Sequence, residues 1–370
     1  WELNKGLDQL GEAEKKRVAE LTSGLKSDRE KAEALYRYMQ SRTRYASIQL
    51  GIGGYKPAPA MEVSEKGYGD CKGLTNYMYA LLREAGITSH YTWVRAGTNK
   101  SIIPAFVSDQ FDHIILCVPL QGDTVWLECT SQTQPFNFLG SFTCDRDVLL
   151  ITPDGGKMVR TPPFSHSYRK STGIINVNRR EASKGSLRMT SGGLGFDKNQ
   201  IFSGKSVIEM KRMINEGMAL GTFRADTAAY REITEGEPVS ELDFDLTLND
   251  FAVVAGTRIH FNPCLNGFGH QPFDTVSVRI YEVEELIDSI VYRFPAEYRA
   301  EHIPSPVSAE GPYGSYRYSI ETLDDGSLLF RRKLSLNKGI YTGDRARELF
   351  VFLNTAARSD QRRIYLNRAQ

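Results

Sequence analysis

The stretch that decides the fold is GDCKGLTNYMYALLREAGI, residues 69–87. Its second residue, Asp70, has the short acceptor side chain that caps the N-termini of helices. Apolar residues then recur every three or four positions, which predicts a helix with one buried face. Gly86 is expected to end that helix. Cys71 therefore takes the first helical position, where backbone N–H groups and the positive end of the helix dipole stabilise a thiolate.

A histidine and an acid follow this cysteine on a predicted β-hairpin. Residues 111–120 are a mostly apolar run that contains His113 near its start, and residues 124–130 are a second run that contains Glu128. Antiparallel pairing of the two runs can bring Glu128 beside His113 at the strand ends. A carboxylate there would fix the imidazole tautomer and stabilise the imidazolium. The chain order is thus a helix-start cysteine, a strand histidine and a strand acid.

These motifs resemble those of the transglutaminase-like superfamily, which comprises papain-like enzymes with a Cys-His-Asp triad. The matching residues are Gly69-Asp70-Cys71, Asp112-His113 and Trp126-Leu127-Glu128. The resemblance covers roughly residues 10–155 and implies an α+β fold in which a helix packs on an antiparallel sheet. The sequence departs from the family pattern at the third motif, where Glu128 replaces the usual Asp. Glutamate is one methylene longer, and Ser-His-Glu triads show that the role tolerates it.

The resemblance implies a cysteine peptidase, amidase or acyltransferase that acts on a protein or peptide substrate. Cys71 would attack a peptide or amide carbonyl, His113 would carry the proton, and Glu128 would orient His113 while an acyl-thioester forms. Hydrolysis is favoured over cross-linking, since water needs no second binding site. The alternative is a catalytically idle transglutaminase-like module that binds protein or glycan at the cell envelope, because fold alone does not fix function.

Other candidate residues have structural interpretations beside the functional ones. His90 lies in an alternating run and is expected to be structural, whereas Gln49 is either an oxyanion donor or part of a core strand. The backbone N–H of Cys71 is the safer oxyanion donor. The glycine- and proline-rich segment 51–60 is either a wall of the substrate cleft or an ordinary loop. We do not expect this segment to bind a nucleotide, because no Gly-Lys-Ser/Thr follows it and no helix begins directly after it. Three tyrosines are expected at the rim of the cleft: Tyr45, Tyr55 and Tyr68.

Composition limits the partners and cofactors. The chain has 370 residues, 41% hydrophobic and 25% charged, with a net charge of +1, which argues against nucleic acid as a partner. No apolar run is long enough to span a bilayer. The five cysteines lack the spacing of a zinc site, and we expect no cofactor. A disulfide between Cys129 and Cys144 is left open. The resemblance favours a cell-envelope or periplasmic location over the cytoplasm, and the start at Trp1 rather than Met suggests a fragment or processed form.

The chain is expected to contain two domains. Residues 1–160 would form the transglutaminase-like cysteine domain, with two helices over 12–25 and 28–42 ahead of the Cys71 helix. The Pro-rich stretch after residue 160 marks the boundary. Residues 161–370 alternate like short strands, which predicts an antiparallel β-sandwich with a few helices. His260 and His270 in this domain are read as loop or core residues rather than metal ligands.

Overall fold

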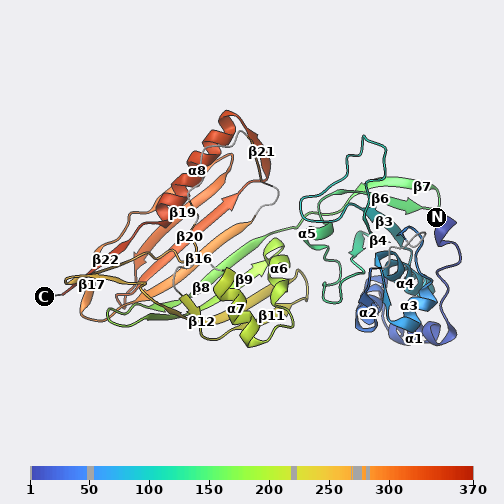
Figure 1. Ribbon diagram of the computed structural model, residues 1–370, viewed down its shortest axis with the longest axis horizontal. Coiled ribbons are helices and arrows are strands. Elements are labelled where there is room, and N and C mark those ends of the chain that lie inside the picture. The colour runs from blue at the N-terminus through green and yellow to red at the C-terminus, as the bar shows by residue number, and fades with distance from the viewer. Residues whose placement is uncertain are drawn as a thin grey trace. The chain divides into compact units, whose positions relative to one another are not determined.

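The structure is a computed structural model that describes residues 2–47, 54–217, 223–267, 269, 277–280 and 284–369. The chain divides into two compact units, Trp1–Phe164 and Ser165–Gln370 (Figure 1). Both units combine helices with mostly antiparallel sheets, so the predicted α+β class is confirmed. Among the described helices, none combines the length and the apolar character that a bilayer crossing requires.

The three helices predicted for the N-terminal unit, α1, α2 and α4, begin where the sequence indicates, whereas α3 and α5 were not predicted. The second helix starts after Ser27, whose hydroxyl accepts the Glu30 N–H while the Glu30 carboxylate accepts the Ser27 N–H, a complete capping box. The first helix ends three residues earlier than expected, at Thr22. The helices of this unit are α1 (Glu12–Thr22), α2 (Asp28–Arg42), α3 (Ala60–Lys66), α4 (Cys71–Glu84) and α5 (Gly140–Thr143).

Five antiparallel strands form the sheet of this unit, in the order β5-β4-β3-β6-β7. The predicted hairpin is present, and its two-residue turn uses Gly122 with a φ of +80°, a backbone conformation that glycine adopts without strain. Its second strand ends at residue 127, three residues before the expected end. The strands are β3 (His90–Val94), β4 (His113–Leu120), β5 (Asp123–Leu127), β6 (Asp147–Thr152) and β7 (Gly155–Arg160), while β1 (Arg44–Tyr45) and β2 (Tyr68–Gly69) form a separate short parallel pair.

Helix α4 lies against the central strands and is buried along most of its length. Leu74, Met78 and Leu81 pack with Leu116 of β4, while the neighbouring residue Ile115 packs into a smaller cluster on the opposite face of the sheet. Strand β4 is therefore buried on both faces, which explains its nearly continuous apolar sequence. The N-terminus of α4 and the start of β4, which carry the candidate residues, are held by this core.

The C-terminal unit is built on a nine-stranded sheet that is antiparallel apart from the parallel pairing of β8 with β16. A four-stranded sheet, β13-β14-β22-β17, shares its hydrophobic core. The strands of the large sheet are β8 (Tyr168–Asn176), β9 (Ser183–Gly192), β10 (Phe223–Ala225), β11 (Ala229–Ile233), β12 (Val239–Leu248), β16 (Glu285–Arg293), β18 (Val307–Gly311), β19 (Gly314–Thr322) and β20 (Leu328–Leu336). The remaining strands are β13 (Val253–Ala255), β14 (Arg258–Phe261), β15 (Ser277–Ile280), β17 (Tyr298–His302), β21 (Gly339–Thr342) and β22 (Ile364–Arg368).

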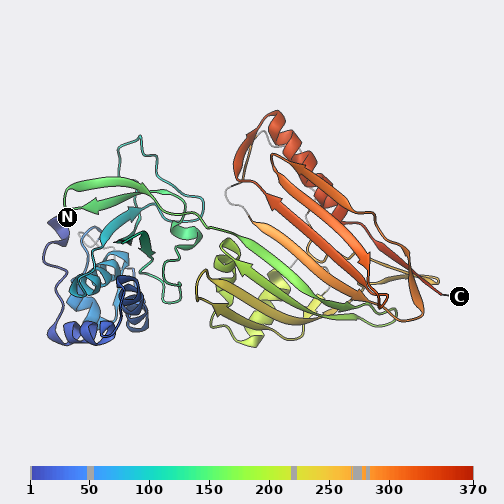
Figure 2. The same cartoon turned by 180° about the vertical axis from the view of Figure 1, so that it is seen from behind.

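The main helices of this unit cover one face of the large sheet, as Figures 1 and 2 show from opposite sides. Helix α7 buries Met210 and Ile214 in the same core into which α8 buries Leu349 and Leu353. The helices are α6 (Leu194–Asn199), α7 (Val207–Gly217) and α8 (Asp344–Asp360), in keeping with the few helices expected from the sequence.

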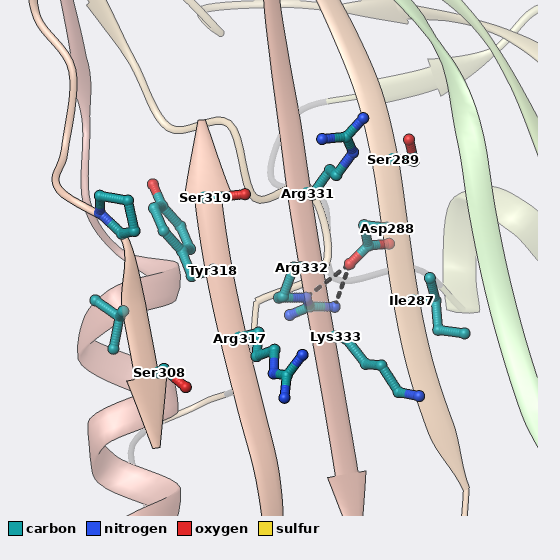
Figure 3. A pocket seen from close by; sticks show the side chains of 12 residues that line it. Ile287, Asp288, Ser289, Ser308, Arg317, Tyr318, Ser319, Arg331, Arg332 and Lys333 are labelled. Atoms are coloured by element: carbon teal, nitrogen blue, oxygen red, sulfur yellow. Dashed lines mark hydrogen bonds and ion pairs between the residues drawn. The ribbon is translucent and has the colours of Figure 1, made fainter. Parts of the chain in front are cut away.

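A buried ion network crosses this core. The Arg332 side chain is 1% exposed and contacts Asp288 on the neighbouring strand at 2.6 Å (Figure 3) and Asp360 at the end of α8 at 2.7 Å. The hydroxyl of Tyr316 donates to the other oxygen of Asp360 at 2.6 Å. Desolvating these charges is costly, and the cost is offset only while all partners are present. The network thus ties α8 to the middle of the sheet.

We expect Arg332→Met to lower the free energy of unfolding of the C-terminal unit by about 3–5 kcal/mol, because two buried carboxylates lose their counter-charge. The matched control is Arg331→Met on the same strand. Arg331 is half exposed and pairs with Glu321, so its loss should cost at most about 1 kcal/mol. Urea unfolding followed by circular dichroism measures both. Equal costs for the two variants would show that the buried network does not stabilise the sheet.

Candidate active site

Cys71 occupies the first position of α4, as predicted. One oxygen of Asp70 accepts the Gly73 N–H at 2.9 Å, and its other oxygen pairs with the Lys72 ammonium. Asp70 and Lys72 are both buried, so the pair fixes the turn that presents Cys71. The first N–H groups of a helix have no acceptor within the helix. A negative charge on the Cys71 sulfur, or on an oxygen bound next to it, would therefore be stabilised here.

His113 is the first residue of β4 and pairs in register with Val94 of β3. Its ring stands edge-on to the Phe142 ring, with 5.3 Å between centroids, and its side chain interacts with the Cys71 thiol. Burial by itself lowers the pKa of His113. The charge of Glu128 and the hydrogen bonds that His113 makes to Cys71 and to the Glu128 carboxylate outweigh that effect and raise the pKa from 6.5 to about 10. The imidazole is therefore positively charged at neutral pH.

Glu128 lies just beyond the end of β5, and its carboxylate is buried against His113. The two carboxylate oxygens lie 3.1 and 3.0 Å from Nε2 of His113, and Thr130 donates to Glu128 Oε1 from its backbone N–H at 3.1 Å and its hydroxyl at 2.5 Å. Burial raises the pKa of Glu128, but the charge and hydrogen bond of His113 and the Thr130 bonds leave it lowered. Tyr36 of α2 donates to the Glu128 carbonyl at 2.7 Å, which fixes the backbone.

The three predicted residues therefore meet although they lie on three different elements. Extending the β4–β5 register from Leu116↔Leu127 places Thr130 opposite His113 and Glu128 two residues away. Glu128 is thus a diagonal neighbour of His113 across the two chain segments, and a side chain as long as that of glutamate can span this separation. The extra methylene of Glu128 suits this geometry, so the departure from the family's usual Asp does not separate the acid from the histidine.

A pocket of about 390 Å³ opens at Cys71 and His113. It is lined by residues from several segments of the chain: Gly54, Tyr55, Cys71, Lys72, Trp93, Asp109, Phe111, Asp112, His113 and Ile114. The lining combines aromatic rings with two aspartates and one lysine, and that lysine is paired with Asp70. The pocket can hold a segment of a substrate with its reacting carbonyl close to Cys71.

Several predicted cleft residues lie elsewhere or outside the described residues. Tyr55 lines the pocket, whereas Tyr45 and Tyr68 belong to the short β1–β2 pair and do not. His90 lies on β3 opposite Cys117, in keeping with a structural role, and burial lowers its pKa. Gln49 and residues 51–53 lie outside the described residues, so the predicted oxyanion role of Gln49 stays a prediction.

Sequence reasoning did not predict that Asp109, Phe111 and Asp112, in the segment before β4, line the pocket, although Asp112 belongs to the histidine motif. Asp112 accepts the Ala96 N–H at 2.7 Å and thereby closes the base of the β3–β4 loop. Its position directly before His113 is the one signal that could have indicated a place in the cleft. Lys72, next to the cysteine, was also overlooked, and only the structure shows that it is buried.

Three of the other four cysteines, Cys117, Cys129 and Cys264, are unsuited to nucleophilic chemistry. Burial raises the pKa of Cys117 to about 11 and raises those of Cys129 and Cys264 further. Cys129 is a free thiol, so the disulfide with Cys144 that the sequence left open does not form here. Within the described ranges, no group of three potential metal-binding side chains comes together. His260 instead contacts Arg363 at 3.2 Å and the Tyr365 ring, while His270 lies outside the described residues.

The C-terminal unit has a larger pocket, of about 620 Å³, over strands β16, β18, β19 and β20 (Figure 3). Four basic residues line it: Arg317, Arg331, Arg332 and Lys333. Three of them form ion pairs: Arg331 with Glu321, Arg332 with Asp288, and Lys333 with Glu285. Among the described residues that line it there is no cysteine and no histidine, so its serine hydroxyls have no imidazole beside them to act as a base. The pocket at Cys71 is therefore the candidate active site despite its smaller volume.

Comparison with known proteins identifies the families that the two units resemble. The family model of the transglutaminase-like superfamily matches residues 15–134, which include Cys71, His113 and Glu128. Residues 257–366 match a domain family of unknown function with a solved structure, DUF3858. Among curated proteins, none matches this chain.

A solved structure with a similar fold is that of a candidate protease from Parabacteroides distasonis. The TM-score is 0.54 at 12% sequence identity, and the match covers 99% of this chain and 57% of the other. This chain thus spans little more than half the length of that neighbour, and the similarity concerns the fold. The N-terminal unit of this chain is a cysteine-enzyme-like module of the transglutaminase-like superfamily.

Proposed function

We propose that this protein is a cysteine hydrolase that cleaves peptide or amide bonds through an acyl-thioester on Cys71. The observation that carries the proposal is the buried contact of His113 with Glu128, beside the cysteine at the start of α4. A charged imidazole next to a helix-start sulfur favours the thiolate, which is the nucleophilic form. The same residues also suit acyl transfer to an amine, which is the second outcome of the chemistry.

The first half of the reaction needs a nucleophile and an acid. The Cys71 sulfur attacks the carbonyl carbon, and the oxyanion that forms is stabilised by backbone N–H groups at the start of α4. His113 then gives its proton to the leaving nitrogen, and the C–N bond breaks to leave a thioester. The Glu128 carboxylate accepts a hydrogen bond from Nε2 of His113. Nδ1 is therefore the nitrogen of the His113 ring that is left for this proton transfer. Glu128 also stabilises the imidazolium before the proton leaves.

The second half reverses the roles. His113, now neutral, takes a proton from water as the water oxygen attacks the thioester carbon, and the carboxylic acid leaves as the Cys71 sulfur is regained. Hydrolysis is favoured over amine transfer, because water needs no second binding site whereas an amine donor does. The expected cell-envelope location stays a prediction.

The His113–Glu128 pair predicts how stability depends on pH. The pKa of His113 is raised from 6.5 to about 10 on folding, so its contribution is full below pH 6.5 and is lost as pH rises toward 10. We expect the free energy of unfolding of the N-terminal unit to fall between pH 7 and 10, by at most about 1.4 kcal/mol per pH unit from this group. Glu128→Gln should flatten the decline, because the neutral amide no longer supports the imidazolium.

Tryptophan fluorescence suits this measurement, since Trp1, Trp93 and Trp126 all belong to the N-terminal unit. Urea titrations at several pH values should give a steeper pH dependence for the wild type than for Glu128→Gln. Glu128→Asp should lie between them, because it keeps the charge but shortens the reach. Identical slopes for the wild type and Glu128→Gln would mean that the carboxylate does not set the charge of His113.

The reaction itself is tested with a panel of peptides that contain a glutamine side chain, an isopeptide bond or an ordinary peptide bond. Each is incubated with and without a primary amine, and the products are identified by mass spectrometry. We expect hydrolysis of at least one class, loss of that activity in Cys71→Ala, and near-normal activity in the control Cys117→Ser. If the amine is incorporated faster than the peptide is hydrolysed, the protein is a transferase and the proposed hydrolase function is wrong. If a folded sample reacts with none of the peptides, the alternative of a catalytically idle module that binds protein or glycan would be favoured.

A further inference from the structure

We propose that the loop between β3 and β4 binds an apolar side chain of an extended polypeptide substrate as that substrate leaves the pocket. The proposal rests on the proposed function, because it names the substrate class for the same site. It makes the loop, residues 95–112, a recognition element that lies outside the reacting groups. The substrate would be an unfolded or extended polypeptide with apolar residues, in contrast to a small amide.

The tip of this loop exposes three large apolar side chains within five residues. Ile103 and Phe106 are each 63% exposed, and Val107 is 98% exposed. Single exposed apolar residues are common on protein surfaces, whereas a cluster of them marks an interaction site. Ile102 beside them is buried, so the segment is anchored while the next residue points outward. The loop therefore presents apolar surface that the N-terminal unit does not cover.

The loop is also held in a defined shape. Ile103-Pro104-Ala105-Phe106 is a turn closed by the Phe106 N–H on the Ile103 carbonyl at 3.0 Å, with proline at its second position. The Gln110 side chain accepts the Ile103 N–H at 2.9 Å and donates to the carbonyls of Ile103 at 3.1 Å and Phe106 at 2.7 Å. One side chain thus satisfies three backbone groups of the tip. A preorganised loop loses little entropy when a ligand packs on it.

The tip is continuous with the wall of the pocket. Asp109, Phe111 and Asp112 follow it directly in the chain, and all three line the pocket that holds Cys71. A chain bound with its carbonyl at Cys71 and extending past this wall therefore meets the tip. Phe111 also packs edge-on against Trp93, another lining residue, with 6.1 Å between ring centroids. Aromatic surface thus leads from the pocket toward the exposed tip.

Charge favours a polypeptide over a membrane as the occupant. Loops that insert into anionic bilayers are flanked by several lysines or arginines. Residues 97–110 contain one lysine, Lys100, and one aspartate, Asp109, so their net charge is zero. Asp109, which follows the exposed residues of the loop, would be repelled by anionic lipid headgroups. Apolar contact with a peptide side chain needs no such charge and gains free energy from the area that both partners bury.

The test measures binding without turnover, so that it does not depend on the reaction. The protein is the full chain with Cys71→Ala, and the probe is a synthetic library of acetylated heptapeptide amides that is sequenced after capture. We expect peptides rich in Leu, Ile, Phe or Val to be enriched roughly tenfold over Ser-rich peptides, which corresponds to burial of about one apolar side chain. Adding Phe106→Ser and Val107→Ser should abolish most of that enrichment. Both residues are exposed, so these changes leave the core intact.

The matched control is Met158→Ser on β7, which removes an apolar side chain that is 44% exposed and does not line the pocket. It should leave the enrichment unchanged. Equal enrichment in the loop variant and the control, or no enrichment at all, would overturn the proposal. The proposal would also be overturned if Phe106 and Val107 bind another occupant in place of the peptides. The two occupants to test are vesicles of phosphatidylcholine and phosphatidylglycerol, and a second copy of this chain. Loop-dependent binding in a protein that hydrolyses nothing would contradict only the proposed hydrolase activity.

Discussion

A buried carboxylate can stay charged only beside a positive partner, and that constraint links most of the N-terminal unit. Glu128 and His113 have side chains that are 5% and 8% exposed, so each needs the other to remain ionised. The geometry of the pair depends on the β4–β5 register, on Tyr36 holding the backbone of Glu128, and on the packing of α4 against β4. Cys71 then meets an imidazole whose charge and orientation are already set. The hydrophobic core thus positions helix α4 and strands β4 and β5, and these elements in turn position Cys71, His113 and Glu128.

Much of this unit could be predicted because its signals are local. Asp70 ahead of a helical apolar pattern gave the start of α4, and Gly122 between two apolar runs gave the hairpin. The end of β5 was predicted too late, because alternation of side chains continues through Glu128 and Cys129 after pairing has stopped at Leu127. The meeting of Cys71, His113 and Glu128 was expected from their order and family resemblance. Sequence alone could not provide the distances or the direction in which burial and charge shift the pKa of His113.

The residues that were missed act through contacts between segments distant in the chain. Nothing in the local pattern around Asp109 or Phe111 shows that this segment borders Cys71, because the contact depends on where β4 begins relative to α4. Lys72 reads as a solvated helix residue, yet it is buried and paired with Asp70. The Arg332 network in the C-terminal unit is similar, since Asp288 and Asp360 are each at least 28 residues from Arg332 along the chain. Such ion pairs depend on how the chain folds, and no periodic pattern in the sequence predicts them.

The central claim is that Cys71 is a nucleophile activated by a histidine that Glu128 keeps charged. The most direct measurement is the rate at which each cysteine of the native chain is alkylated by iodoacetamide near neutral pH, followed by peptide mass mapping. The account predicts that Cys71 reacts well before the other four cysteines, and that Glu128→Gln slows Cys71 without changing the order of the rest. Uniform slow labelling of all five, or labelling of Cys117 as fast as that of Cys71, would contradict it.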